Sequence, residues 1–143
     1  MLTGRNALVT GAGKGIGKAI AMELAANGAF VIVNYNGSKA AAEQTVAEIK
    51  EAGGDAVAYQ CNVADYKACA GMTADLIKSY AHIDILVNNA GITRDGLLMK
   101  MSEEDFDAVI DTNLKGCFNT IRHLSRYFIK QRAGKIINIS SVS

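Results

Sequence analysis

Five short apolar runs, separated by segments with helical periodicity, constrain the fold of this 143-residue chain more than any other feature. Several of the runs are continuous and rich in Val and Ile, which is typical of strands covered on both faces in a parallel sheet. Strands that alternate with helices are joined by right-handed crossovers. The pattern therefore predicts a doubly wound α/β fold with strand order 3-2-1-4-5. The predicted strands are residues 6–10, 30–34, 56–60, 84–88 and 135–140.

The segments between these runs carry apolar residues at every third or fourth position, as on one face of a helix. Ser38, Asp65 and Ser102 stand where helix N-caps are expected. The stripe that begins at Ser102 continues to Phe128 without a break, so it predicts one helix of ~40 Å. No repeat or linker interrupts the chain, and residues 1–143 are expected to form a single domain.

Charge and hydropathy exclude several classes of protein. The chain has 15 Lys and Arg against 14 Asp and Glu, and a formal net charge of +1 is too small to attract a nucleic acid by long-range field. No apolar run approaches the roughly 20 residues needed to cross a bilayer. The N-terminus also lacks the pattern of a secretory signal. We therefore expect a cytoplasmic protein that binds neither nucleic acid nor membrane.

The cysteines and histidines do not form a recognisable metal or disulfide pattern. Cys61, Cys69 and Cys117 contain no Cys-x-x-Cys pair, and their odd number argues against a complete disulfide framework. Buried free thiols are expected. His82 and His123 have no other ligands at metal-binding spacing, so no metal site is predicted.

The segment TGAGKGIG, residues 10–17, lies between the first predicted strand and the first predicted helix. Glycines at that place let the backbone approach a pyrophosphate, whose charge is favoured by free N–H groups at the helix N-terminus. In this context the segment predicts dinucleotide binding in a Rossmann-type sheet. The alternative is a tight turn that needs glycine only for its dihedral angles. The candidate residues are Gly11, Gly13, Lys14, Gly15, Ile16 and Gly17.

Three further motifs follow in order: NNAG at residues 88–91, NLKG around Asn113, and INISS at the fifth predicted strand. NNAG stands at the carboxyl end of the fourth strand, where ligands bind in open α/β sheets. Together with TGAGKGIG, these motifs resemble the short-chain dehydrogenase/reductase family over the whole chain. Within that family, residues 91–101, GITRDGLLMKM, are similar to the 3-oxoacyl-acyl-carrier-protein reductases of type II fatty acid synthesis. Acetoacetyl-CoA reductases are similar in this segment too.

The resemblance implies a nicotinamide dinucleotide cofactor. An NAD enzyme of this fold places Asp or Glu at the end of its second strand to accept from the ribose hydroxyls. This chain has Asn34, Tyr35 and Asn36 there, so no carboxylate would repel a 2′-phosphate, and Lys14 could pair with one. We therefore expect NADP(H). The resemblance also assigns Asn62 and Val63 to the adenine, and Asn88, Asn89, Ala90 and Gly91 to the cofactor cleft.

The resemblance further implies hydride transfer to a carbonyl, with a tyrosine as proton donor and a lysine that lowers its pKa. Ser141 matches the family serine that hydrogen-bonds the carbonyl oxygen. Asn113 matches an asparagine that binds a water on the proton path, although a buried Asn satisfied by backbone groups is the alternative. No Tyr-x-x-x-Lys pair follows Ser141 in these residues. Tyr35 and Lys39 have that spacing, but at the adenosine side of the expected site.

Two functions of different kinds remain open at this point. In the first, these residues belong to an NADPH-dependent reductase of 3-oxoacyl-acyl-carrier-protein, or of acetoacetyl-CoA or another carbonyl compound. In the second, they are a truncated and catalytically inert nucleotide-binding or assembly fragment. An apolar fifth strand left at the edge of the sheet favours the first function.

Expected partners follow from the same resemblance. Arg132 matches a basic position that the family uses near the active-site mouth to meet the acidic acyl carrier protein; a partner for the helix dipole is the alternative. The helix from Ser102 has more apolar residues than one core-facing stripe requires, which suggests a subunit interface. Similar reductases are homotetramers. The surplus residues include Cys117, Phe118, Tyr127 and Phe128.

Overall fold

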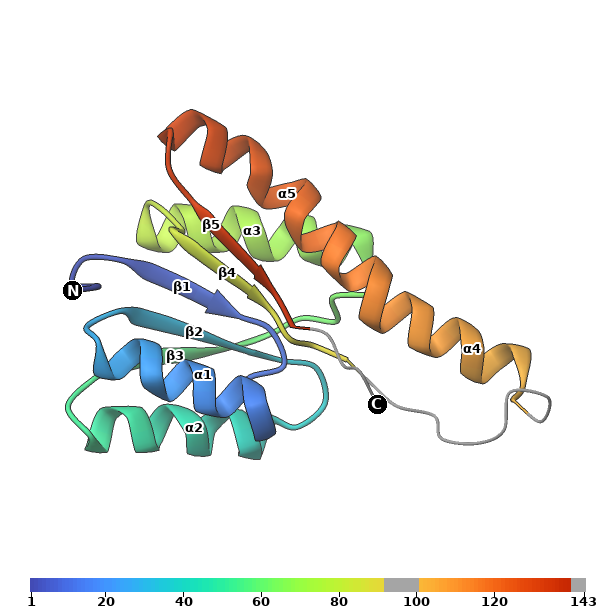
Figure 1. The fold of residues 1–143 in the computed structure, drawn as a ribbon, viewed down its shortest axis with the longest axis horizontal. Helices are drawn as coiled ribbons and strands as arrows, with labels where there is room; N and C mark the ends of the chain where they lie inside the picture. Colours follow the sequence, from blue (N-terminus) through green and yellow to red (C-terminus); the bar gives the residue numbers. More distant parts are fainter. Residues whose placement is uncertain (92–100, 140–143) are drawn as a thin grey trace.

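The computed structural model describes residues 1–91 and 101–139, which form one parallel five-stranded sheet with helices on both faces (Figure 1). The strand order is β3-β2-β1-β4-β5, so the predicted Rossmann-type topology is confirmed. The strands differ from the predicted ranges by one or two residues at their ends. They are β1 Asn6–Val9, β2 Phe30–Tyr35, β3 Asp55–Gln60, β4 Ile85–Asn88 and β5 Lys135–Asn138.

Alternate residues of the central strands pack against different helices, because successive side chains of a strand point to opposite faces. Val31 and Val33 are buried in a cluster with residues of α1, Gly15–Ala26, and α2, Lys39–Glu51. Leu8, which pairs in register with Ile32 and Leu86, faces α3, Tyr66–Tyr80, and α5, Gly116–Gln131. This double cover explains why the strands are apolar along their whole length.

The long helix predicted from residue 102 is continuous from Glu103 to Gln131, but a π-helical segment within it was not predicted. α4, Glu103–Val109, begins where the Ser102 hydroxyl accepts a hydrogen bond from the Asp105 backbone N–H at 3.0 Å. A π-helical segment, η2, Ile110–Lys115, then leads into α5. A π-helical turn holds more residues than an α-helical one, and the spacing of four between Phe106, Ile110 and Leu114 is compatible with either.

The turn between β1 and α1 packs directly against the backbone that follows β4. Gly11 has a φ of +61°, and a Cβ at this position would lie 2.9 Å from the Ala90 Cα. A Cβ at Gly17 would overlap both the Gly11 carbonyl and the Asn89 side-chain amide. Glycine is thus required at these two positions by a close approach between segments almost eighty residues apart.

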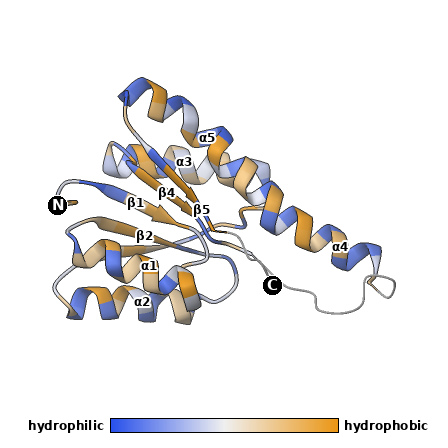
Figure 2. Cartoon of the chain, in the orientation of Figure 1, coloured by the Kyte–Doolittle hydropathy of each residue, from blue (hydrophilic) through white to orange (hydrophobic). Residues whose placement is uncertain are grey.

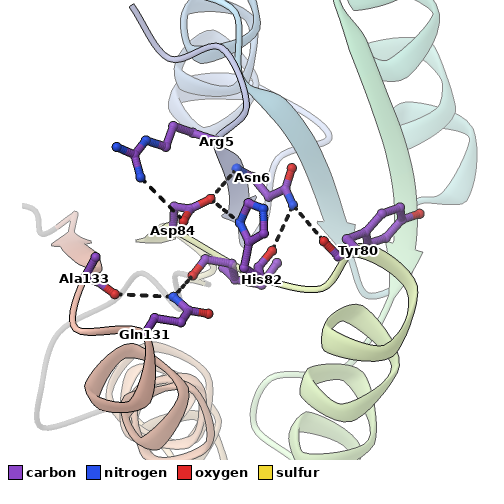
Figure 3. Close-up of polar contacts among 8 residues, drawn as sticks. Arg5, Asn6, Tyr80, His82, Asp84, Gln131 and Ala133 are labelled. Atoms are coloured by element: carbon purple, nitrogen blue, oxygen red, sulfur yellow. Dashed lines mark hydrogen bonds and ion pairs between the residues drawn. The ribbon is translucent and has the colours of Figure 1, made fainter.

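At the opposite, amino-terminal edge of the sheet, polar contacts gather around Asp84 (Figure 3). Its carboxylate accepts a hydrogen bond from the Asn6 backbone N–H at 2.8 Å and pairs with His82 Nδ1 at 2.7 Å and Arg5 at 3.9 Å. The Asn6 side chain in turn donates to the carbonyls of His82 and Tyr80. These contacts tie the start of β1 to the connection between α3 and β4.

We expect Gly17→Ala to lower the free energy of unfolding by about 1–3 kcal/mol, although alanine favours helices, because the added methyl overlaps fixed backbone. Gly13→Ala is the matched control, since a Cβ there meets Ala42 N at 3.3 Å and Ala41 Cβ at 3.4 Å and needs only a small shift. Urea unfolding of both variants measures the difference. Equal losses would contradict the close approach at Gly17.

Asp84→Ala should also lower the free energy of unfolding, by about 1–3 kcal/mol, because the half-buried Asn6 N–H loses its acceptor. Asp84→Asn keeps the shape and one acceptor oxygen, so it should cost less. Thermal and urea unfolding of the two variants provide the comparison. If Asp84→Ala unfolds like the parent protein, the contacts of Figure 3 do not stabilise this edge.

Candidate functional site

A cleft of about 330 Å³ opens at the carboxyl ends of the strands, where open α/β sheets bind ligands. Its volume lies within the range of small-molecule sites. Its walls come from four segments: the β1–α1 turn, the end of β2 with the start of α2, the segment after β3, and the segment after β4. Predicted residues that line it are Gly11, Gly13, Lys14, Asn34, Tyr35, Asn36, Asn62, Val63, Ala90 and Gly91.

The N-terminus of α1 gives this cleft a positive pole. Lys14 is the exposed N-cap residue of α1 and lines the cleft, and no acidic residue occupies the first turn. The unpaired N–H groups and the dipole at such an end favour a bound anion. Gly15, Ile16 and Gly17 form this first turn but do not line the cleft themselves; Ile16 is 63% exposed.

Asn34 lies at the cleft as predicted, but its side chain forms its hydrogen bonds with backbone groups of the protein. It is buried, with 2% of its surface exposed. Its Oδ1 accepts from the Gly11 N–H at 3.3 Å, and its Nδ2 donates to the carbonyls of Tyr59 at 3.3 Å and Cys61 at 3.1 Å. Asn34 therefore ties the glycine turn to the ends of β2 and β3. The exposed Asn36, also at this edge, remains accessible to a ligand.

Thr10 and Asn89 hold the glycine turn against the segment after β4. The Thr10 hydroxyl oxygen accepts from the Asn89 N–H at 3.0 Å and the Ala90 N–H at 2.9 Å. The Asn89 side chain donates to the Gly11 carbonyl at 3.1 Å. Asn89 thus shapes the cleft through Gly11 and is not part of its lining.

The segment after β3 forms the third wall. Asn62 is exposed, and its Oδ1 accepts from the Ala64 N–H at 3.0 Å. The Val63 carbonyl accepts from the Asn119 side-chain amide at 2.8 Å and from the Cys69 thiol at 3.4 Å. Helices α3 and α5 therefore both fix the backbone of this wall.

The candidate catalytic residue Asn113 lies in the π-helical segment η2 and is exposed, so the alternative of a buried structural asparagine does not hold. It reaches the site across the segment after β4, because a Cβ on Gly91 would lie 3.1 Å from the Asn113 Oδ1. Its neighbour Thr112 lines the cleft. Ser141 lies outside the described residues.

A polar relay that the sequence did not reveal joins β4 to β5 and α5; Asn88 and Thr120 are buried in it, and Asn138 is exposed. The Thr120 hydroxyl donates to Asn88 Oδ1 at 2.6 Å, and Asn88 Nδ2 donates to Asn138 Oδ1 at 2.9 Å. The Asn88 carbonyl accepts from the Ile139 N–H at 3.0 Å. Asn88, assigned to the cleft on the resemblance, thus acts here as a link between strands. A polar residue within a strand end, such as Asn138, is the signal that could have predicted it.

Other lining residues were also missed. They adjoin predicted ones in the sequence or form the next helical turn, and they are Gly37, Ser38, Ala41, Cys61 and Thr112. Arg132 is the C-cap of α5, and two residues separate it from β5. Within one chain it therefore lies at the amino-terminal edge of the sheet, and its contact with acyl carrier protein stays a prediction.

The described ranges, residues 1–91 and 101–139, contain no group of three or more His, Cys, Asp or Glu side chains arranged to hold a metal ion. Within the same ranges, no helix combines the length and the hydropathy needed to cross a membrane.

Curated relatives are identical to this chain at about half of the aligned positions. The 3-oxoacyl-[acyl-carrier-protein] reductase FabG of Staphylococcus aureus is 53% identical over 138 residues, which are 96% of this chain and 56% of that protein. The 3-oxoacyl-[acyl-carrier-protein] reductase of Synechocystis sp. is 51% identical over 142 residues, 99% of this chain and 58% of that protein. The chain therefore spans somewhat more than half the length of these relatives.

Solved structures show the same fold. A metagenomic short-chain oxidoreductase in complex with NADP superposes with a TM-score of 0.94 at 36% identity, over 99% of this chain and 64% of that one. A short chain dehydrogenase from Mycobacterium avium gives 0.90 at 45% identity, over 97% and 54%. The model of the short chain dehydrogenase family matches residues 5–143. The chain belongs to the short-chain dehydrogenase family.

Proposed function

We propose that this chain binds NADP(H) in the cleft at the carboxyl edge of the sheet. The observation that carries the proposal is the pairing of a free helix N-terminus, with Lys14 as its N-cap, and a β2 end without a carboxylate. The helix N-terminus favours the phosphates of the cofactor, and a β2 end without a carboxylate does not repel a phosphate on the ribose. The donor set present therefore fits a phosphorylated dinucleotide. Asn36 and Asn62 are the exposed polar side chains that would meet the adenosine half.

We further propose that the protein reduces a 3-oxoacyl thioester carried by acyl carrier protein. When bound, the cofactor supplies a hydride for a carbonyl carbon. Ser141 would donate a hydrogen bond to the carbonyl oxygen and so favour the negative charge that develops there. Asn113, beside Gly91 at the cleft, would hold a water on the path that replenishes the proton donor. This proposal is supported by the sequence identity of 51–53%, over the aligned residues, to reductases that carry this substrate in their names.

Two other functions remain candidates. Acetoacetyl-CoA or another carbonyl compound would use the same cleft and the same hydride chemistry. A catalytically inert nucleotide-binding fragment would use the same cleft for binding alone.

We propose that the protein assembles as a homotetramer. We also propose that it is located in the cytoplasm. Helix α4, η2 and the start of α5 project beyond the sheet in Figure 1, and Figure 2 colours apolar bands along them. Large apolar side chains are exposed there: Phe106 by 51%, Leu114 by 65% and Phe118 by 57%. A row of this kind is typical of a subunit interface.

The cofactor proposal predicts that a change of charge at either of two exposed cleft residues weakens the binding of NADP⁺ selectively. Lys14→Ala should weaken binding of NADP⁺ about tenfold, which corresponds to ~1.4 kcal/mol, and leave NAD⁺ binding nearly unchanged. Asn36→Asp, which adds a negative charge in nearly the same shape, should also weaken NADP⁺ selectively. Lys78→Ala, an exposed lysine in the last turn of α3, is the control. Calorimetric titration measures all three; equal affinity of the parent protein for both nucleotides would contradict the proposal.

The catalytic proposal predicts that turnover depends on a Tyr-x-x-x-Lys pair, because general acid catalysis contributes ~10² to 10⁴ in rate. We expect a protein that carries the pair to oxidise NADPH with acetoacetyl-CoA as a surrogate substrate. Residues 1–143 alone should bind NADP⁺ but turn over at least about a hundredfold more slowly. The intact mass of the natural gene product shows whether it is longer than residues 1–143. Comparable turnover by residues 1–143 would refute the need for the pair.

A further inference from the structure

Helix α5 carries one fully buried amide, that of Asn119, on the side that faces the segment after β3. The side chain is 0% exposed, and its Nδ2 donates to the Val63 carbonyl at 2.8 Å. The opposite orientation of the amide is excluded, because two acceptor oxygens at that distance would repel each other. The remaining Oδ1 is buried and has no hydrogen-bond partner within residues 1–91 and 101–139. The amide thus holds Val63 and leaves its own acceptor unpaired.

Folding by itself does not require this amide. A buried acceptor without a partner costs free energy, whereas an apolar side chain of the same size carries no such cost. The Val63 carbonyl would keep a donor without Asn119, because the Cys69 thiol also donates to it, at 3.4 Å. Residues that break a rule of stable packing are expected at functional sites. The role of Asn119 is therefore to be found in what its bond to Val63 holds in place.

The peptide that Asn119 holds reaches the cleft in one further step. The Val63 carbonyl and the Ala64 N–H belong to the same planar peptide, so fixing the direction of one fixes the direction of the other. The Ala64 N–H donates to Asn62 Oδ1 at 3.0 Å. Asn62 is exposed and lines the cleft. Two hydrogen bonds and one peptide thus lead from the buried amide of α5 to a side chain that a ligand can touch.

The backbone of α5 fixes the same wall at a second point. A Cβ on Gly116, one turn before Asn119, would lie 2.8 Å from Val63 Cγ2, so the Val63 side chain packs directly on the helix backbone. This contact sets the distance of Val63 from α5, and the bond from Asn119 sets the direction of its carbonyl. Val63 is 5% exposed and still lines the cleft. The wall therefore takes both its position and its orientation from α5.

We propose that Asn119 is a positioning residue for the adenosine half of the bound cofactor. It fixes the peptide between Val63 and Ala64, and this peptide orients the Asn62 side chain toward the ligand. Because Asn62 is already ordered, the ligand does not bear the entropic cost of ordering it. Donation to the carbonyl also strengthens the N–H of the same hydrogen-bonded chain as a donor. The identity of the ligand rests on the proposed function, whereas the path from Asn119 to Asn62 does not.

The first experiment is a double-mutant cycle on the binding of adenosine 2′,5′-bisphosphate, measured by calorimetric titration. Asn119→Leu should weaken binding about five- to tenfold, the effect of one hydrogen bond, while its free energy of unfolding in urea stays close to that of the parent protein. Asn62→Ala should also weaken binding. Added to Asn62→Ala, Asn119→Leu should cause no further loss, because the two residues act in one path. Fully additive losses, or parent-like binding by Asn119→Leu, would overturn the proposal.

Thr73→Val is the matched control for this cycle. The Thr73 hydroxyl on α3 is likewise buried and without a recorded partner, but in the described part of the chain no bond leads from it to the cleft. Its replacement should leave stability and binding unchanged. Asn119→Ala, which adds no atoms to the core, is the second variant and should show the same dependence on Asn62. A loss with Thr73→Val as large as that with Asn119→Leu would overturn the proposal.

The second experiment needs no ligand. In the free protein, the Ala64 amide hydrogen should exchange about five- to tenfold faster in Asn119→Leu, because its peptide is no longer held toward Asn62. The Ala68 N–H, which donates to the Asp65 carboxylate at the start of α3, is the internal control and should exchange at an unchanged rate. An unchanged rate at Ala64 would overturn the proposal. A parent protein that binds neither NADP⁺ nor adenosine 2′,5′-bisphosphate would instead overturn the proposed function, and the exchange rate would still decide whether Asn119 holds this wall.

Discussion

The close contact between the β1–α1 turn and the segment after β4 is the constraint on which the rest of the site depends. Gly11 and Gly17 leave no room for a side chain at this contact, and Thr10 and Asn89 lock it with hydrogen bonds between the two segments. Because the turn is held there, the N-terminus of α1 is fixed at the carboxyl edge of β1. A ligand phosphate would therefore meet a preorganised set of N–H groups, whose ordering has already occurred on folding.

The two edges of the sheet use polar groups differently. At the amino-terminal edge, Asp84 and Asn6 satisfy one another and the nearby backbone, and Gln131 donates to the carbonyls of Ile83 and Ala133 (Figure 3). At the carboxyl edge, the buried asparagines are likewise committed to protein groups. Their role is to fix the walls, and the exposed side chains between them carry the recognition chemistry. Rigid walls with a few accessible polar groups are typical of a ligand site.

Much of the fold could be predicted because periodicity is a local property. Runs such as Val31 to Val33 are apolar at every position, and only a strand with helices on both faces buries all of them. The π-helical segment around Asn113 could not be predicted, because it is defined by backbone hydrogen bonds that the pattern of apolar residues does not specify. The Asn88–Thr120–Asn138 relay was also hidden, since its members come from three elements far apart in the sequence.

The sequence alone determined the order of the elements, the parallel sheet and the position of the glycine turn between β1 and α1, because these depend on the character of neighbouring residues. The tertiary structure alone decided which of the candidate residues remain open to a ligand. Asn34 and Asn36 are almost equivalent in the sequence, yet one is buried against three backbone groups and the other is exposed. Burial and long-range hydrogen bonds depend on the whole chain, and a local pattern does not contain them.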